Sequence, residues 1–101
     1  MSQTNKLINI VKQLDEMEIR FKEKYKQLLL KISSEVNELK KDMYKNELED
    51  VKRIIRKICS VKLVLSSMAE LNIIDKDELE YAREELRTIA PELSIELLEL
   101  L

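Results

Sequence analysis

Residues 47–69 read ELEDVKRIIRKICSVKLVLSSMA, and this stretch determines how we expect the rest of the chain to fold. Its apolar residues recur at steps of three and four, which places them on one stripe of a helix. The stripe consists of Val51, Ile54, Ile55, Ile58, Val61, Leu65 and Met68. Four basic residues stand off the centre of that stripe, at Lys52, Arg53, Arg56 and Lys57. Because one helix cannot bury such a stripe alone, the flanking segments or a partner must cover it.

The composition excludes most catalytic and cofactor chemistry. The 101 residues include no glycine, no histidine, one proline and one cysteine. The phosphate-binding loops of nucleotide enzymes need glycine, while catalytic triads and many zinc sites need histidine. We therefore expect a protein that is not an enzyme and has no metal, no cofactor and no small-molecule substrate. The single thiol, Cys59, is expected to be a small buried hydrophobic side chain.

The charge divides unevenly along the chain, although the net charge is only −2. Residues 1–68 carry 15 Lys/Arg against 10 Asp/Glu, whereas residues 69–101 carry 3 against 10. This asymmetry indicates two surfaces with different partners, or one half docking on the other. No stretch approaches the roughly 18 apolar residues of a membrane span, and no signal peptide is visible. We expect a soluble, cytoplasmic protein with no membrane contact.

Apolar residues between Leu7 and Met43 also follow steps of three and four, without an intervening proline or glycine. The pattern predicts one continuous helix of about 40 residues and about 60 Å, after a frayed N-terminus at residues 1–6. A break at Ser33–Ser34, the one weak point, would give two shorter helices instead.

The long helical segments can associate within one chain or between chains. Heptad spacing from Val11 to Ile32 is typical of a coiled coil, but Glu18 interrupts it. An antiparallel hairpin is therefore at least as well supported as a long parallel coiled coil. Lys45–Asn46 is another candidate joint, because Asn46 can cap a helix, although one helix could equally run through it.

Residues 72–75 form the clearest boundary in the chain. Asn72 can adopt the left-handed conformation that ends a helix, and Asp75 can cap the next one. We expect that helix to extend from residue 76 to about residue 89, because Pro91 prevents it from continuing.

An apolar tail helix at residues 92–101 completes the prediction. We expect it to close the bundle; the alternative is that it docks into a partner's groove. Its candidate partner contacts are Leu97, Leu98 and Leu101. The predicted fold of the single domain 1–101 is all-α: a helical bundle built from a long hairpin and one or two short C-terminal helices, with coiled-coil packing as an alternative.

The basic residues of the central helix are the best candidates for contact with nucleic acid, and Lys62 extends the set. A positive stripe suffices to bind phosphate. The acidic overall balance and the lack of an aromatic stacking platform limit this prediction to weak DNA contact. A solvated helix face and docking on an acidic protein surface are the alternatives.

The order of elements resembles the helical domain of GINS subunits. The resemblance covers residues 20–90 and lies in FKEKYKQLLLKI, the lysine-rich NELKKDMYKN, and ELEDVKRIIRKICSVKL with its Arg53–Ile54 pair, followed by the acidic DELEYAREEL. GINS subunits form a non-enzymatic complex that joins the replicative helicase to polymerase and primase. The resemblance implies an accessory subunit in DNA replication.

Together these features predict a non-catalytic subunit that forms homo- or hetero-oligomers through its apolar stripes. Partner contacts are expected at the face from Lys52 to Lys57 or in the tail at Leu97, Leu98 and Leu101. The alternative functions are a nucleic-acid-binding protein that uses the basic face, and a self-assembling coiled-coil scaffold or regulatory or viral protein.

Overall fold

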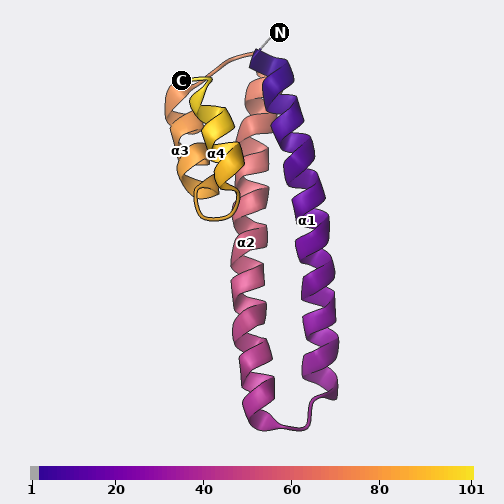
Figure 1. Cartoon of the computed structure of the whole chain (residues 1–101). Helices are drawn as coiled ribbons and strands as arrows, with labels where there is room; N and C mark the ends of the chain where they lie inside the picture. Colours follow the sequence, from indigo (N-terminus) through magenta and orange to yellow (C-terminus); the bar gives the residue numbers. More distant parts are fainter. Residues whose placement is uncertain (1–2) are drawn as a thin grey trace.

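Within residues 3–101, which the computed structural model describes, the chain forms four helices. They are α1 (Gln3–Ser34), α2 (Glu38–Leu71), α3 (Lys76–Leu86) and α4 (Pro91–Leu98). The two long helices form an antiparallel hairpin, and α3 and α4 pack beside one end of it (Figure 1). The predicted all-α fold, with a long hairpin and short C-terminal helices, is confirmed.

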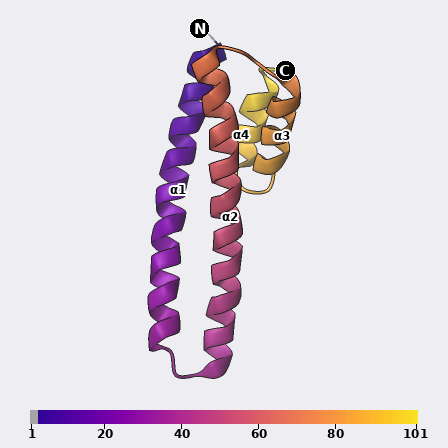
Figure 2. The same cartoon turned by 180° about the vertical axis from the view of Figure 1, so that it is seen from behind.

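The molecule is elongated, with extents of 54 × 18 × 18 Å. Seen from behind, α3 and α4 cover the hairpin only near the chain termini, and the other half of the hairpin projects beyond them (Figure 2). We call residues 19–56 the arm, and residues 3–18 together with 57–101 the head. This division separates a four-helix region from a two-helix region.

The continuous core lies in the head. Its fully or nearly buried side chains come from all four helices, and Phe21 and Ile54 at the base of the arm pack against them. Within residues 19–56, the buried hydrophobic residues are Leu28 and Val51. The core consists of Leu7, Ile10, Leu14, Ile58, Val61, Leu65, Met68, Leu79, Ala82, Leu86, Ala90, Leu93, Leu97 and Leu100.

The expectation of one continuous helix from Leu7 to Met43 is wrong, because the chain turns between Ser34 and Glu38. The hydroxyl groups of Ser33 and Ser34 donate to the Leu30 carbonyl, at 2.9 and 3.0 Å, at the end of α1. Serine hydroxyls compete with the helical backbone in this way. The helix breaks directly after the weak point in the sequence, and the two long helices then cover each other's apolar stripes.

Asn37, rather than Asn46, caps the second long helix. The Asn37 side chain accepts a hydrogen bond from the Lys40 backbone N–H at 3.1 Å. The candidate joint at Lys45–Asn46 therefore lies inside α2, which runs straight through it. A side-chain oxygen at this position satisfies one of the backbone donors that a helix start leaves free.

The predicted frayed N-terminus extends too far. Residues 3–6 belong to α1, and only residues 1–2 lie outside the described part of the chain. The Thr4 hydroxyl donates to the Asn72 side-chain oxygen at 2.6 Å, and Leu7 is fully buried. The start of α1 is thus held against the end of α2.

The boundary at residues 72–75 is confirmed. Asn72 has a φ of 54°, which is the left-handed conformation that ends many helices. The Asp75 carboxylate accepts from the backbone N–H groups of Asp77 and Glu78 at 2.9 and 3.1 Å. The third helix stops at Leu86, three residues before the predicted end.

Pro91 is the first residue of the last helix. Proline suits the first turn of a helix because its missing N–H would have no helical partner there. Leu93, Leu97 and Leu100 are buried in the head core, so the tail closes the bundle as expected. Ser94 is buried and donates to the Arg83 carbonyl at 3.0 Å, which joins α4 to α3.

Candidate interaction surfaces

The basic residues of α2 do not form one continuous face. Lys52 and Arg56 line a groove between the two long helices. Arg53 and Lys57 line a separate hollow near the end of α3. Lys62 points toward α1, where its ammonium group contacts the carboxylates of α1. The basic residues predicted to form one surface therefore lie in three separate places on the hairpin.

Most of these cations already have a carboxylate partner. Lys52 pairs with Glu49 at 3.0 Å, and Arg53 pairs with Asp50 at 3.1 Å. Lys57 lies 4.0 Å from Glu85 of α3. Local pairing of this kind reduces the positive potential that phosphate binding requires. The structure thus brings together only part of the predicted basic surface.

The groove at Lys52 and Arg56 is walled by both long helices. Its apolar surface includes Tyr25 of α1 and Ile55 of α2, and its volume is about 430 Å³. Lys22 and Lys26 line the α1 side, and Lys52 and Arg56 line the α2 side. The groove therefore combines an apolar centre with four cations.

A second hollow of about 470 Å³, lined by α1 alone, adjoins this groove at Lys26 on the side toward the arm tip. Leu29 and Leu30 add apolar surface there, and Leu30 is 69% exposed. We call the combined feature the arm groove. It is lined by Lys22, Tyr25, Lys26, Leu29, Leu30, Ser33, Lys52, Ile55 and Arg56.

The α1 residues of the arm groove were not predicted as site residues. Nothing in the sequence alone distinguishes Lys22 and Lys26 from the other lysines of residues 20–31. Their relation to Arg56 depends on where the chain reverses, and the turn lies between Ser34 and Glu38. The available signal was the position of lysines directly beside the apolar stripe, which is where a paired helix would lie.

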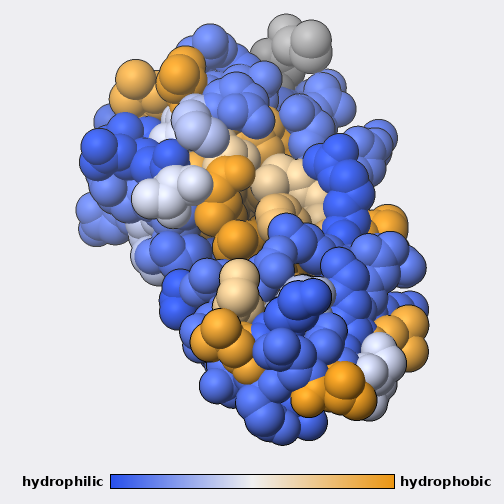
Figure 3. All heavy atoms as spheres, turned by 60° about the horizontal axis from the view of Figure 1, so that its bottom comes forward, coloured by the Kyte–Doolittle hydropathy of each residue, from blue (hydrophilic) through white to orange (hydrophobic). Residues whose placement is uncertain are grey.

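The end of the arm exposes large hydrophobic side chains. Val36, Leu39 and Met43 are 92, 75 and 62% exposed, and we call these three residues the arm tip. With the arm end turned toward the viewer, hydrophobic groups appear there among hydrophilic ones (Figure 3). The Lys31 ammonium lies 5.6 Å from the centre of the Tyr44 ring and links the two helices near this end.

Glu18 lies at the junction of head and arm and is only 9% exposed. Lys62 donates to its carboxylate at 2.6 Å, and Lys22 forms a second ion pair with it at 3.0 Å. These two contacts lower the pKa of Glu18 from 4.5 to about 2. The hydrogen bonds that Lys62 donates to the carboxylates of Asp15 and Glu18 raise the pKa of Lys62. Glu18, which interrupts the heptad spacing, is therefore a charged residue of α1 that pairs with Lys62 of α2.

Cys59 is exposed, so its expected burial as a small hydrophobic residue is wrong. Its thiol donates to the Glu18 carboxylate at 3.3 Å, which explains why this position faces the polar junction. Partial desolvation and the hydrogen bond to Glu18 raise the pKa of the Cys59 thiol. A raised pKa keeps a thiol protonated and weakly nucleophilic.

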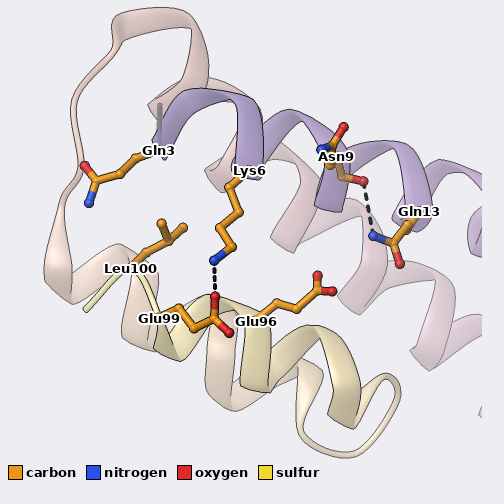
Figure 4. Close-up of a pocket in the computed structure, with 7 residues that line it drawn as sticks. All are labelled: Gln3, Lys6, Asn9, Gln13, Glu96, Glu99 and Leu100. Atoms are coloured by element: carbon orange, nitrogen blue, oxygen red, sulfur yellow. Dashed lines mark hydrogen bonds and ion pairs between the residues drawn. The ribbon is translucent and has the colours of Figure 1, made fainter. Parts of the chain in front are cut away.

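A polar cleft of about 440 Å³ separates α1 from the end of the chain. Figure 4 shows Lys6 of α1 and Glu99, just after α4, pointing toward one another as an ion pair. Asn9 and Gln13 line the α1 side, where the Gln13 amide donates to the Asn9 carbonyl at 3.5 Å. The cleft is the polar border of the contact that closes the bundle.

The three predicted tail contacts occupy different surroundings. Leu97 is fully buried in the head core, so it cannot serve as a partner contact in this fold. Its burial follows from its position in α4 next to Leu93, Leu100 and the α3 core residues. Leu98 and Leu101 are exposed on the outer side of the same segment. One side of the tail therefore packs on the head core and closes the bundle, and the other side is exposed at the surface.

Within residues 3–101, no three His, Cys, Asp or Glu side chains are grouped so that they could hold a metal ion. The same part of the chain has no helix that combines the length and the hydropathy needed to cross a bilayer. Comparisons with protein families, with curated proteins and with solved structures gave no match. The surfaces described above are therefore the basis for inferring function.

Proposed function

We propose that this chain is a non-catalytic protein–protein interaction subunit of a multiprotein assembly, and that the arm carries its partner-binding surface. The observation that carries the proposal is the exposure of Val36, Leu39 and Met43 at the end of a projecting hairpin. Isolated exposed apolar residues are ordinary, but a group of them at one site indicates an interaction surface.

The position of the arm supports this proposal over the coiled-coil scaffold. The two long helices already pair within one chain, so α1 and α2 satisfy much of each other's apolar stripe. Within the arm, the large exposed apolar residues lie at the tip, along α1 at Leu29 and Leu30, and singly at Ile19, rather than in an uninterrupted heptad seam. Such a distribution fits local docking of a partner better than a long homotypic coiled coil.

DNA replication is the most specific form of the proposed role. Its support is the resemblance of residues 20–90 to the helical domain of GINS subunits. On this proposal the chain would be an accessory subunit that contacts polymerase, helicase or primase components without performing a reaction itself.

A pull-down from the native organism tests the proposal. Tagged full-length protein would be compared with Val36→Gln/Leu39→Gln/Met43→Gln, and with Leu63→Gln/Leu71→Gln as a control at exposed positions of α2 in the head. Each sample would be washed at moderate and at high salt, and bound proteins would be identified by mass spectrometry. Because all five residues are exposed, both variants should fold.

We expect the wild type and the head control to retain a defined protein that the arm-tip variant loses. Reconstitution with that purified protein should reproduce the difference. Polymerase, helicase or primase components would support the replication role. Recovery of the chain alone, as a defined oligomer, would contradict the proposal and favour the scaffold.

A further inference from the structure

We propose that the arm groove binds an acidic amphipathic helix of a partner protein. Apolar side chains of that helix would cover Tyr25 and Ile55, while its carboxylates would pair with Lys26 and Arg56. This inference rests on the proposed function, because it names the chemical class of partner that the arm receives.

The length of the groove fits a helix. Its α1 wall extends from Lys22 to Ser33, which is about 16 Å at 1.5 Å per residue. A docked helix of about three turns would span this distance. Helices that dock into grooves place apolar anchors at steps of three and four, and two such anchors fit the sequential hollows that meet at Lys26.

The charges along the groove select an acidic partner. Lys22 and Lys52 already pair with Glu18 and Glu49. By contrast, Lys26 and Arg56 have no carboxylate within ion-pair distance in residues 3–101. These two cations lie on opposite walls of the groove, so a helix between them can offer carboxylates to both. Complementary charges at the rim of an interface favour specificity and fast association.

The apolar surface of the groove argues against nucleic acid as its ligand. Phosphate groups gain nothing from covering Ile55, Leu29 or Leu30, whereas an amphipathic helix buries them. Tyr25 is the single aromatic residue in the groove, which is too few for a base-stacking platform.

A second copy of the chain is also a poorer fit. Two arms meeting groove to groove would bring eight cations together, four from each copy, and like charges at an interface oppose binding. The acidic α4 could instead dock into the groove of a neighbour. That contact would be head-to-tail and would form a closed ring or an open chain of copies rather than a defined two-fold dimer.

A peptide titration tests the inference directly. The probe is a fluorescein-labelled 18-residue peptide with leucine at the heptad a and d positions and glutamate at the others, a pattern that is amphipathic when the peptide forms a helix. Binding to the full-length protein would be followed by anisotropy at physiological salt. A peptide with lysine in place of every glutamate controls for charge, and an all-glutamate peptide controls for the apolar contribution.

Two charge-reversed variants provide the matched comparison. Lys26→Glu/Arg56→Glu alters the groove, and Lys40→Glu/Lys41→Glu makes the same net change near the start of α2. We expect the groove variant to weaken binding of the leucine–glutamate peptide by about tenfold or more. The control variant should change it by less than about twofold, and Leu30→Ser should weaken it while leaving net charge unchanged.

Equal losses in the two charge variants would overturn the inference, since net charge alone would then account for binding. If a 20-base-pair DNA duplex bound more tightly than the peptide, and Lys26→Glu/Arg56→Glu weakened that binding as well, the groove would be a nucleic-acid site instead. Self-association that Lys26→Glu/Arg56→Glu abolishes would assign the groove to a second copy. Failure of the peptide to bind, while the pull-down still recovers a partner lost with the arm tip, would sink this inference and leave the proposed function intact.

Discussion

The head and the arm are built from the same two long helices but bury very different amounts of their apolar surface. In the head, residues such as Leu14 and Ile58 are fully buried because α3 and α4 cover α2 and α1. In the arm, Leu28 and Val51 are the buried hydrophobic residues, and the remaining apolar groups are partly or largely exposed. The difference shows that an apolar stripe becomes a core only where a further layer covers it.

We expect the arm to be less stable than the head. Isolated helices gain most of their stability in proteins from packing rather than from propensity. Each arm helix packs on one other helix, whereas the head helices share a continuous core. We therefore expect the arm to open locally before the head unfolds.

The largest expected effect comes from replacing leucine by alanine at one head position and at one arm position of α1. Leu14→Ala removes a fully buried head side chain, and we expect it to lower the free energy of unfolding by about 3–5 kcal/mol. Leu28→Ala removes a buried arm side chain and should cost about 2 kcal/mol, because the two-helix arm can relax around the gap. Equilibrium urea unfolding measures both values.

Equal costs at Leu14 and Leu28 would contradict the distinction between the two regions. Should Leu14→Ala fail to fold, Leu14→Val and Leu28→Val give the same comparison at smaller cost. Leu30→Ala, at an exposed arm position, should change stability by less than about 0.5 kcal/mol.

The next test concerns the charged junction between head and arm. The folded-state pKa of Glu18 is lowered from 4.5 to about 2, so the unfolded state binds its proton more readily. The stabilisation is therefore present above about pH 4.5 and is lost as pH falls toward 2. Because Lys22 is largely solvated, we expect a loss of about 1–2 kcal/mol rather than the full effect of the pKa shift.

Thermal unfolding of the wild type and Glu18→Gln between about pH 6 and pH 2 measures this contribution. The melting temperatures should differ near neutral pH and converge at the acidic end. Parallel curves for the two proteins would show that Glu18 does not contribute through its charge.

A smaller effect is expected at the two helix caps. Asp75→Ala removes the cap of α3 in the head and should lower global stability by about 1 kcal/mol. Asn37→Ala removes the cap of α2 at the arm end and should have a smaller global effect. It should instead speed amide hydrogen exchange near residues 38–45, since local fraying there does not require the head to unfold.

Hydrogen exchange detected by mass spectrometry, together with urea unfolding, separates the two cap variants. If Asn37→Ala changed exchange throughout the head as well, the arm and head would form one cooperative unit. This result would contradict the expectation that the arm opens locally before the head unfolds.

The smallest effect is expected at the Cys59 thiol. Its pKa is raised by partial desolvation and by Glu18, so alkylation by iodoacetamide at pH 8 should be slower than for a free cysteine. Glu18→Gln should lower the thiol pKa and speed the reaction about two- to threefold. Glu16→Gln, on an exposed position of α1, serves as the control. Identical rates for both variants would exclude an electrostatic role for Glu18.

Periodicity predicted the elements better than it predicted their joints. The central stripe is buried or half-buried throughout, and the caps at Asn72 and Asp75 formed as expected. The turn after Ser34 was harder to predict, because no proline or glycine marks it. The turn is stabilised because α1 and α2 cover each other's apolar stripes. These contacts join residues far apart in the sequence, so a local sequence preference does not reveal them.

The surface was less predictable than the fold. A sequence shows that Arg56 is basic, but not that it faces Lys26 across a groove, because this depends on the register of the hairpin. Burial of Leu97 and exposure of Leu98 likewise depend on how α4 lies against α3 and α1. The near-uniform apolar character of the tail gave no preferred side, so only the packed structure separates the two leucines.

Because only residues 35–37 connect the two long helices, the lengths of α1 and α2 determine the length of the arm. Seven residues added to each long helix would preserve the phase of the stripes and move the tip about 10 Å farther from the head. Such a change would leave the head core untouched and would appear as a longer maximum dimension in small-angle scattering. The number of helical turns before the connection therefore sets how far from the head a partner at the arm tip is held.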